Sequence, residues 1–117
     1  MASSSEVTTE VVHDGEVCIL TVSGDLCDDS AITVRDCLME APSDETKHIA
    51  LQCSKIGYVS SAGIGMLVAV LKRMHQQGVS MVLCDLHDEL QELFALTRLD
   101  QVFTIAPSLQ DWRDTQK

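Results

Sequence analysis

The sequence predicts a single α/β domain in which an N-terminal β-hairpin is followed by alternating helices and strands. An Asp-Gly pair at Asp14-Gly15 separates two β-rich runs, which is a strong signal for a two-residue hairpin. Beyond it, apolar runs of strand length alternate with segments whose apolar residues recur every three or four positions. Strands separated by helices pair in parallel, so we expect a mixed sheet packed with about four helices.

The first half of the chain supplies two strands and one helix. Residues 7–12 alternate loosely, whereas residues 17–22 are apolar on both faces, which indicates an interior strand that Ser23-Gly24 is expected to end. A helix through about Met39 follows. Its candidate N-caps are Asp28, Asp29 and Ser30. Its apolar stripe is formed by Ala31, Val34 and Leu38.

The second half repeats the alternation of strand and helix. The remaining strands are expected at residues 48–53, 80–84 and 102–105. One face of the first of these is formed by Ile49, Leu51 and Cys53. An apolar helix before the fourth strand runs to Gln77, where Gly78 is placed to end it. Another helix begins in residues 85–88, and a short final helix carries Trp112, which we expect to dock on the core of this same chain.

Length, composition and charge limit the class of protein to which the chain can belong. With 117 residues, 45% of them apolar, the chain can bury one core and is too apolar to be wholly disordered. We expect one domain over residues 6–115, preceded by a flexible tail at residues 1–5. The net charge of −10, with only eight Lys and Arg, argues against nucleic acid or an anionic membrane surface as a partner. It suits a partner protein with a basic face.

The cysteines and the chain start indicate a reducing compartment. The first residues have neither a basic end nor an apolar stretch, so no secretory signal is expected, and no apolar run reaches the roughly 18 residues that span a bilayer. Five cysteines, an odd number without a CxxC pair, indicate reduced thiols and hence a cytoplasmic protein. Structural roles inside apolar runs are expected for Cys18, Cys53 and Cys84.

Catalytic and cofactor patterns are weak in this sequence. Cys84 and His87 are one pair of candidate metal ligands, but a zinc site needs three or four, so neither a metal nor another cofactor is expected. The serine pair at Ser60-Ser61 lacks a G-x-S-x-G context, and a P-loop is missing. We therefore expect no enzymatic activity. A small enzyme or ligand-binding domain that uses Ser61 or a cysteine stays as a rival, and nucleotide binding is left open.

Residues 57–77 carry the most informative pattern in the chain. A short extended run ends in Ser60-Ser61-Ala62-Gly63, and an apolar helical pattern begins at once. A helix start exposes unpaired N–H groups and the positive end of the dipole, which a serine oxygen or a phosphate can satisfy. Gly63 and Gly65 each cost about 1 kcal/mol of helix stability and leave the first turn open to close approach. The pattern fits a docking site switched by a phosphate, and it also fits two simple capping serines.

The same segment resembles the signature of STAS domains, in particular that of the bacterial anti-sigma factor antagonists. Residues 60–67, Ser-Ser-Ala-Gly-Ile-Gly-Met-Leu, resemble its strand end and helix start. Residues 23–26 resemble its Gly-Glu-Leu-Asp box, residues 78–84 its fourth strand, and residues 90–99 the helix after it. The resemblance covers roughly residues 6–115 and implies a STAS fold.

The resemblance also implies a role in partner switching. In this family the unphosphorylated domain binds an anti-sigma factor that is also a serine kinase of the GHKL ATPase type, and this binding frees a sigma factor. Phosphorylation releases the antagonist, and a PP2C-type phosphatase resets it. Aligned on Gly63, the phosphorylated serine of the family falls on Ser61, with Ser60 as the less favoured position. The implied partner-binding residues are Asp25, Asp28, Asp29, Ser60, Ser61, Ala62, Gly63, Ile64 and Gly65.

Two positions depart from the family pattern. Cys27 stands at the last position of the Gly-Glu-Leu-Asp box, and Ser60 stands where an aspartate often precedes the phosphorylated serine. Both positions lie near the phosphorylation site in the family. These departures favour an alternative in which the domain is a constitutive adaptor subunit of a transport or signalling complex, without a phospho-switch.

Overall fold

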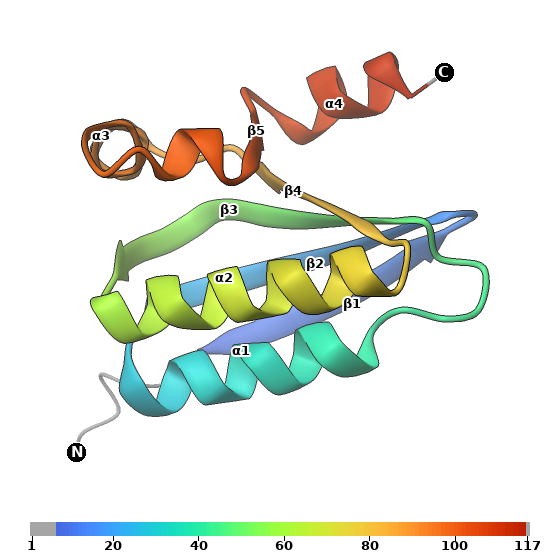
Figure 1. Ribbon diagram of the computed structural model, residues 1–117, viewed down its shortest axis with the longest axis horizontal. Helices are drawn as coiled ribbons and strands as arrows, with labels where there is room; N and C mark the ends of the chain where they lie inside the picture. Colours follow the sequence, from blue (N-terminus) through green and yellow to red (C-terminus); the bar gives the residue numbers. More distant parts are fainter. Residues whose placement is uncertain (1–6, 117) are drawn as a thin grey trace.

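The computed structural model describes residues 7–116, in which five strands form one central sheet (Figure 1). The strands are β1 (Thr8–Asp14), β2 (Val17–Leu26), β3 (His48–Val59), β4 (Ser80–Cys84) and β5 (Thr104–Ala106). The helices are α1 (Asp28–Glu40), α2 (Ser61–Gln76), α3 (Asp88–Leu96) and α4 (Leu109–Thr115), with a 3₁₀ turn at Leu99–Gln101. The tail predicted at residues 1–5 lies outside the described residues.

The strand order in the sheet is β1-β2-β3-β4-β5, so neighbours in sequence are neighbours in space. β1 is antiparallel to β2, and the other pairs are parallel. The predicted fold class, a hairpin followed by alternating helices and strands in a mixed sheet, is confirmed. The last strand begins two residues later than expected, at Thr104, because the chain first makes the 3₁₀ turn.

The hairpin has its two-residue loop at Gly15 and Glu16, one position later than the Asp-Gly pair indicated. Asp14 still belongs to β1 and pairs with Val17 of β2. Gly15 has a φ of +64°, and it is the only one of the two loop residues with a positive φ. This pattern is that of a type II′ turn, which needs glycine at its first central position and matches the twist of the strands.

Two strands are longer than the sequence indicated. β2 continues past Ser23-Gly24, the pair predicted to end it, because its pairing with β3 shifts register on both sides of this pair. Gly24 has a φ of +124°, a conformation that only glycine adopts readily, so it bends the strand without ending it. β3 likewise continues beyond Cys53 to Val59. As a result both strands reach the starts of their following helices at the same end of the sheet.

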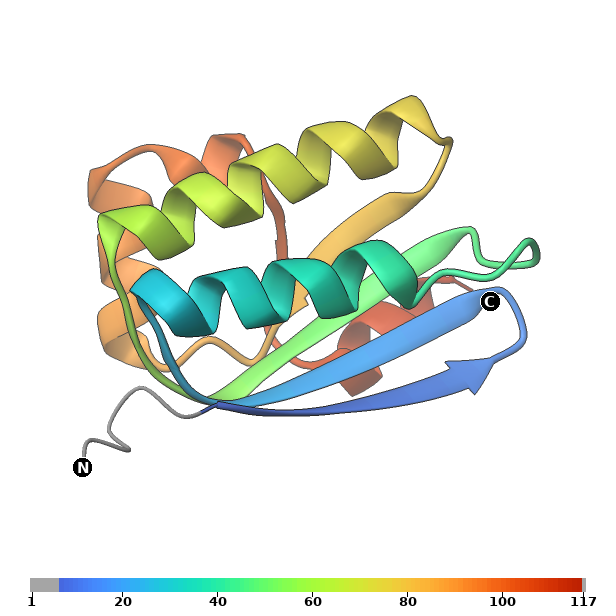
Figure 2. The ribbon, with the colours of Figure 1, turned by 90° about the horizontal axis from the view of Figure 1, so that it is seen from below.

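Helices cover the two faces of the sheet unequally. α1 and α2 lie side by side on one face (Figure 2), and α4 lies on the other (Figure 1). The main core, between the sheet and α1 and α2, contains the predicted strand face and helix stripe: Ile49, Leu51, Cys53, Ala31, Val34 and Leu38. α3 adds Leu90 and Phe94 to this core. The smaller core beneath α4 includes Trp112, whose ring meets the His48 ring edge-on at 5.7 Å, so its predicted docking is confirmed.

Candidate functional site

α2 begins directly after β3, and its two serines occupy different positions there. Ser60 is the N-cap residue: its backbone is extended, and its Oγ accepts a hydrogen bond from the Gly63 N–H at 3.1 Å. Ser61 is the first residue of the helix, and it is exposed. Its hydroxyl has no hydrogen-bond partner among residues 7–116. The cap therefore depends on Ser60, and the Ser61 oxygen is open to reaction.

Gly63 lets α2 approach the turn between β2 and α1. A Cβ at this position would lie 2.5 Å from the Leu26 carbonyl oxygen, much closer than van der Waals contact. The same oxygen accepts a hydrogen bond from the Ser60 N–H at 2.9 Å, so the two turns are directly joined. A Cβ on Gly65, by contrast, would meet open space. Gly63 is thus required by the packing of this chain, whereas Gly65 leaves an exposed gap on the surface of α2.

α1 begins directly after β2 with a cap that the sequence did not indicate. Its N-cap residue is Cys27, so the three candidates Asp28, Asp29 and Ser30 are wrong for that position. Ser30 instead reaches back from inside the helix: its Oγ accepts from the Cys27 N–H at 2.9 Å and donates to the Asp25 carbonyl at 2.6 Å. This buried serine does the capping, and Asp28 and Asp29 are left exposed. Asp28 has a φ of +47°, which an aspartate tolerates better than most residues.

The first turns of α1 and α2 enclose a surface hollow of about 370 Å³. Its lining residues are Asp28, Asp29, Ala31, Ile32, Arg35, Ala62, Met66 and Ala69. The structure therefore brings two of the predicted acidic residues together with Ala62, the neighbour of Ser61. Asp25 does not line the hollow; its side chain lies beside Gly57 of β3, with Oδ1 3.0 Å from the position that a Cβ would take there. Ile64 does not line it either and is half-buried against the main core.

Two exposed side chains beside these turns were not predicted from the sequence as candidate site residues. Tyr58 lies two residues before Ser60 in β3 and is 58% exposed, and Ile32 in the hollow is 50% exposed. Large side chains of this kind are favoured anchors in protein–protein contacts. Ile32 falls outside the apolar stripe of α1, so helical spacing alone could have identified it as exposed. Helical spacing does not apply to Tyr58, which lies in the extended run before Ser60, and the sequence did not show which face of that run is exposed.

The buried cysteines are structural, as predicted. Burial raises the pKa of the Cys53 thiol to about 12 and that of Cys84 to about 11, and it also raises the pKa of Cys18. These thiols stay protonated at neutral pH, so they are poor nucleophiles. In the part of the chain that the structure describes, no three His, Cys, Asp or Glu side chains gather as metal ligands. Nor does any helix between residues 7 and 116 combine the length and apolarity needed to cross a bilayer.

A mixed sheet with two capped helix starts side by side at one end defines a small α/β domain. Residues 8–112 match the STAS domain family, and the chain belongs to this family. Within it, the chain is related to the anti-sigma factor antagonists. The anti-sigma F factor antagonist of Paenibacillus polymyxa is 27% identical over 97 residues, which are 82% of this chain and 83% of the relative.

Solved structures show the same fold. The crystal structure of an anti-sigma factor antagonist from Mycobacterium paratuberculosis has a TM-score of 0.78 at 21% identity, covering 95% of this chain and 94% of the other. The phosphorylated form of SpoIIAA from Bacillus has a TM-score of 0.66 at 11% identity, covering 94% and 100%. Antagonists of this family act by binding and not by catalysis, so the chain is a binding protein and not an enzyme.

Proposed function

We propose that this protein is a cytoplasmic anti-sigma factor antagonist controlled by phosphorylation of Ser61. In its unphosphorylated form it binds an anti-sigma factor that is also a serine kinase of the GHKL type, and a sigma factor is thereby freed. Phosphorylation of Ser61 ends the binding, and a PP2C-type phosphatase restores it. The kinship with the Paenibacillus antagonist and the SpoIIAA fold, which is known in a phosphorylated form, supports this proposal.

The proposal depends on one observation, the different use of two adjacent hydroxyls. The Ser60 oxygen is engaged in the helix cap, whereas the Ser61 hydroxyl is exposed and forms no bond within the described residues. A kinase can therefore modify Ser61 without breaking the cap of α2. A phosphate at the first position of a helix is favoured by the dipole, so the modified domain is expected to stay folded.

The phosphate is expected to act on the partner through charge. It adds about −1.5 to −2 charges at neutral pH. Ser61 adjoins Ala62, which lines the same hollow as the exposed Asp28 and Asp29. Phosphorylation therefore concentrates negative charge on a surface that is already acidic, and it releases a partner whose surface opposite Ser61 has no cation to pair with the phosphate.

The two departures from the family pattern are compatible with this mechanism. The residue before the phosphorylated serine has to cap α2, and Ser60 does so with its own oxygen. The acidic character that Cys27 lacks is supplied by its neighbours Asp28 and Asp29. The constitutive adaptor is the alternative to test against.

The proposal can be tested with the GHKL kinases of the source organism. Wild type, Ser61→Ala and Ser60→Ala would be incubated with each kinase and ATP, and phosphopeptides identified by mass spectrometry. We expect one phosphate that is lost only in Ser61→Ala, and kinase binding by Ser61→Asp that is at least about tenfold weaker, as one desolvated charge repulsion of about 1.4 kcal/mol would give. Absence of phosphate with a kinase that demonstrably binds the domain would support the adaptor instead.

A further inference from the structure

The charges of the chain are strongly segregated. All 18 acidic residues lie at positions 6–45 or 85–114, and residues 46–84 contain none. The same stretch holds four of the eight Lys and Arg residues, so it carries a formal charge of +4 while the rest of the chain carries −14 (−10 minus +4). It corresponds to β3, α2 and β4, the middle of the fold. The middle segment of this acidic protein is therefore basic.

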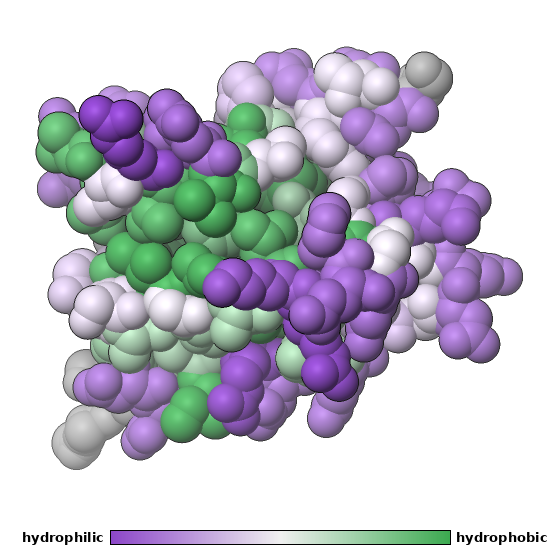
Figure 3. Space-filling model, viewed as in Figure 1, coloured by the Kyte–Doolittle hydropathy of each residue, from purple (hydrophilic) through white to green (hydrophobic). Residues whose placement is uncertain are grey.

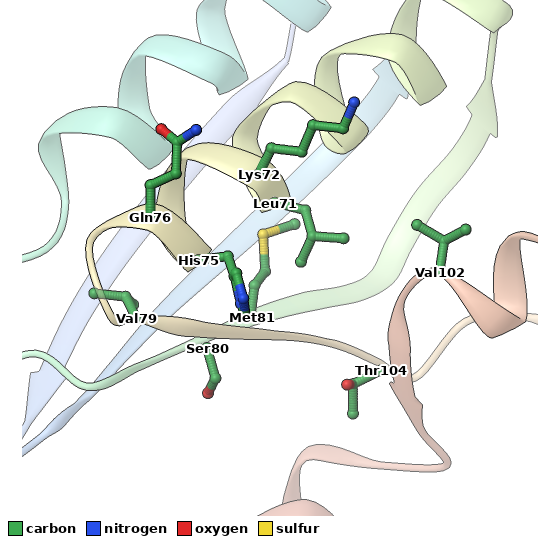
Figure 4. A pocket seen from close by; sticks show the side chains of 9 residues that line it. All are labelled: Leu71, Lys72, His75, Gln76, Val79, Ser80, Met81, Val102 and Thr104. Carbon is green, nitrogen blue, oxygen red and sulfur yellow. The ribbon is translucent and has the colours of Figure 1, made fainter.

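This basic segment forms most of a groove of about 470 Å³ at the C-terminal end of α2 (Figure 4). Its apolar part is formed by Leu71, Val79, Met81 and Val102. Among the polar residues of α2 that line the groove, Lys72 adds a positive charge at the edge, and His75 adds an imidazole ring near the centre. Val102 is 51% exposed, which is unusual for a β-branched residue beside a core. Figure 3 shows hydrophobic surface between α2 and the α3–β5 segment, most of it beside the first part of α2.

The groove exists because the sheet is incomplete at this place. β5 pairs with β4 only at Val82, Leu83 and Cys84, so Ser80 and Met81 have no strand on that side. The segment before β5 makes a 3₁₀ turn and leaves Val102 facing outward instead of pairing. The exposed Val102 and the half-buried Leu71 are thus left accessible at the rim of the groove, whereas Val79 and Met81 form its buried floor.

We propose that this groove docks a short amphipathic segment of a partner protein, whose apolar side chains fill it and whose carboxylates pair with Lys72. Neither Lys72 nor its neighbour Arg73 takes part in either of the two ion pairs of the described residues, so both charges are open to a partner. An acidic ligand is the complement of this surface, although the chain as a whole repels acids. A second copy of the chain is a poor occupant, because two molecules of charge −10 repel each other.

The groove and the proposed phosphorylation site are independent surfaces. Ser61 and His75 lie at opposite ends of α2, about 20 Å apart at roughly 1.5 Å of rise per residue. This separation is more than twice the Debye length of about 8 Å at physiological ionic strength, so a phosphate on Ser61 has little effect at the groove. The domain can accordingly hold two partners at once, and the second is retained when the first is released.

The test uses a synthetic amphipathic peptide with a leucine face and a glutamate face, and its twin with lysine in place of each glutamate. Binding to the ¹⁵N-labelled full chain would be followed by amide chemical shifts. We expect the glutamate peptide to shift signals around Leu71, Met81 and Val102 and the lysine twin to leave them unchanged. Lys72→Glu should weaken the glutamate peptide roughly fivefold, and Val102→Asp about tenfold or more.

A matched control separates the groove from the net charge. Lys55→Glu makes the same change in net charge, but Lys55 is exposed in β3 and is not part of the groove. It should leave the affinity unchanged, as should Ser61→Asp, which tests independence from the phospho-switch. Equal loss in Lys72→Glu and Lys55→Glu, shifts confined to other surfaces, or a dimer that covers the groove in sedimentation would each overturn the proposal.

Discussion

The two turns that lead from a parallel strand into a helix, β2–α1 and β3–α2, both use serine to cap the helix start, but the serines occupy different positions. In β2–α1 the serine is buried: Ser30 bonds both the Cys27 N–H and the Asp25 carbonyl. In β3–α2 one serine, Ser60, makes a single capping bond, and the next, Ser61, makes none within the described residues. The exposed Asp28 and Asp29 lie on the β2–α1 turn, and the exposed hydroxyl of Ser61 lies on the β3–α2 turn. Residue type alone therefore does not distinguish a buried, hydrogen-bonded serine from one whose hydroxyl is exposed and without a partner.

The largest expected effect concerns the contact that joins the two turns. Gly63→Ala places a Cβ 2.5 Å from the Leu26 carbonyl oxygen, and the backbone must move to relieve it. We expect the free energy of unfolding to fall by about 3 kcal/mol, more than the roughly 1 kcal/mol that alanine adds to helix stability. Urea denaturation followed by circular dichroism measures this change. Gly65→Ala, in the same helix with open space around it, should raise stability by up to about 1 kcal/mol. Shifts of the same sign in both variants would contradict the packing role of Gly63.

The second largest expected effect tests the structural role of the buried Ser30. Ser30→Ala leaves the Cys27 N–H without its acceptor in a partly buried turn, so we expect a loss of about 2 kcal/mol in the free energy of unfolding. Thr33→Ala, which removes an exposed hydroxyl from the same helix, is the control and should cost less than about 0.5 kcal/mol. If both variants unfold at the same urea concentration, the cap of α1 does not depend on Ser30.

The smallest effects distinguish the two adjacent serines. Ser60→Ala removes the cap of α2 and is expected to cost about 1 kcal/mol. Ser61→Ala removes a hydroxyl without a partner and should change stability by less than about 0.5 kcal/mol, and Ser61→Asp should be neutral or slightly stabilising at the positive end of the helix dipole. Thermal unfolding of the three variants gives the comparison. A larger loss in Ser61→Ala than in Ser60→Ala would reverse the assignment of their roles.

Sequence patterns located features that depend on local chemistry. The fourth strand was predicted with its observed bounds, Ser80–Cys84, because it is a short apolar run bounded by Gly78 and Asp85. The end of α2 followed from Gly78, whose φ of +77° no other residue adopts as easily. The hairpin, the helix stripes and the burial of Cys18, Cys53 and Cys84 also followed from local pattern. These properties need only a few neighbouring residues to be specified.

The features that were missed depend on contacts between distant segments. Ser23-Gly24 looks like a strand end, but β3 continues to pair with β2 across a register shift that has no signature in β2 itself. Cys27 is the N-cap residue of α1 because the Ser30 hydroxyl bonds the Cys27 N–H and the Asp25 carbonyl, two groups that only the folded turn brings together. The hollow between α1 and α2 likewise requires both helices. The sequence therefore identified the start of α2 with its two serines. That Asp28 and Asp29 lie beside this helix start is visible only in the folded structure.

The strand order has a consequence for how the chain folds. Because each strand of the sheet pairs with the strand just before it in sequence, none has to be inserted between two that are already paired. A chain leaving the ribosome can form the hairpin first and then add one helix and one strand at a time to the growing edge. Each parallel pair then closes a loop that holds a single crossover, so no strand has to wait for a segment farther along the chain before it can pair. The short β5, the last to be added, then closes the sheet over only three residue pairs.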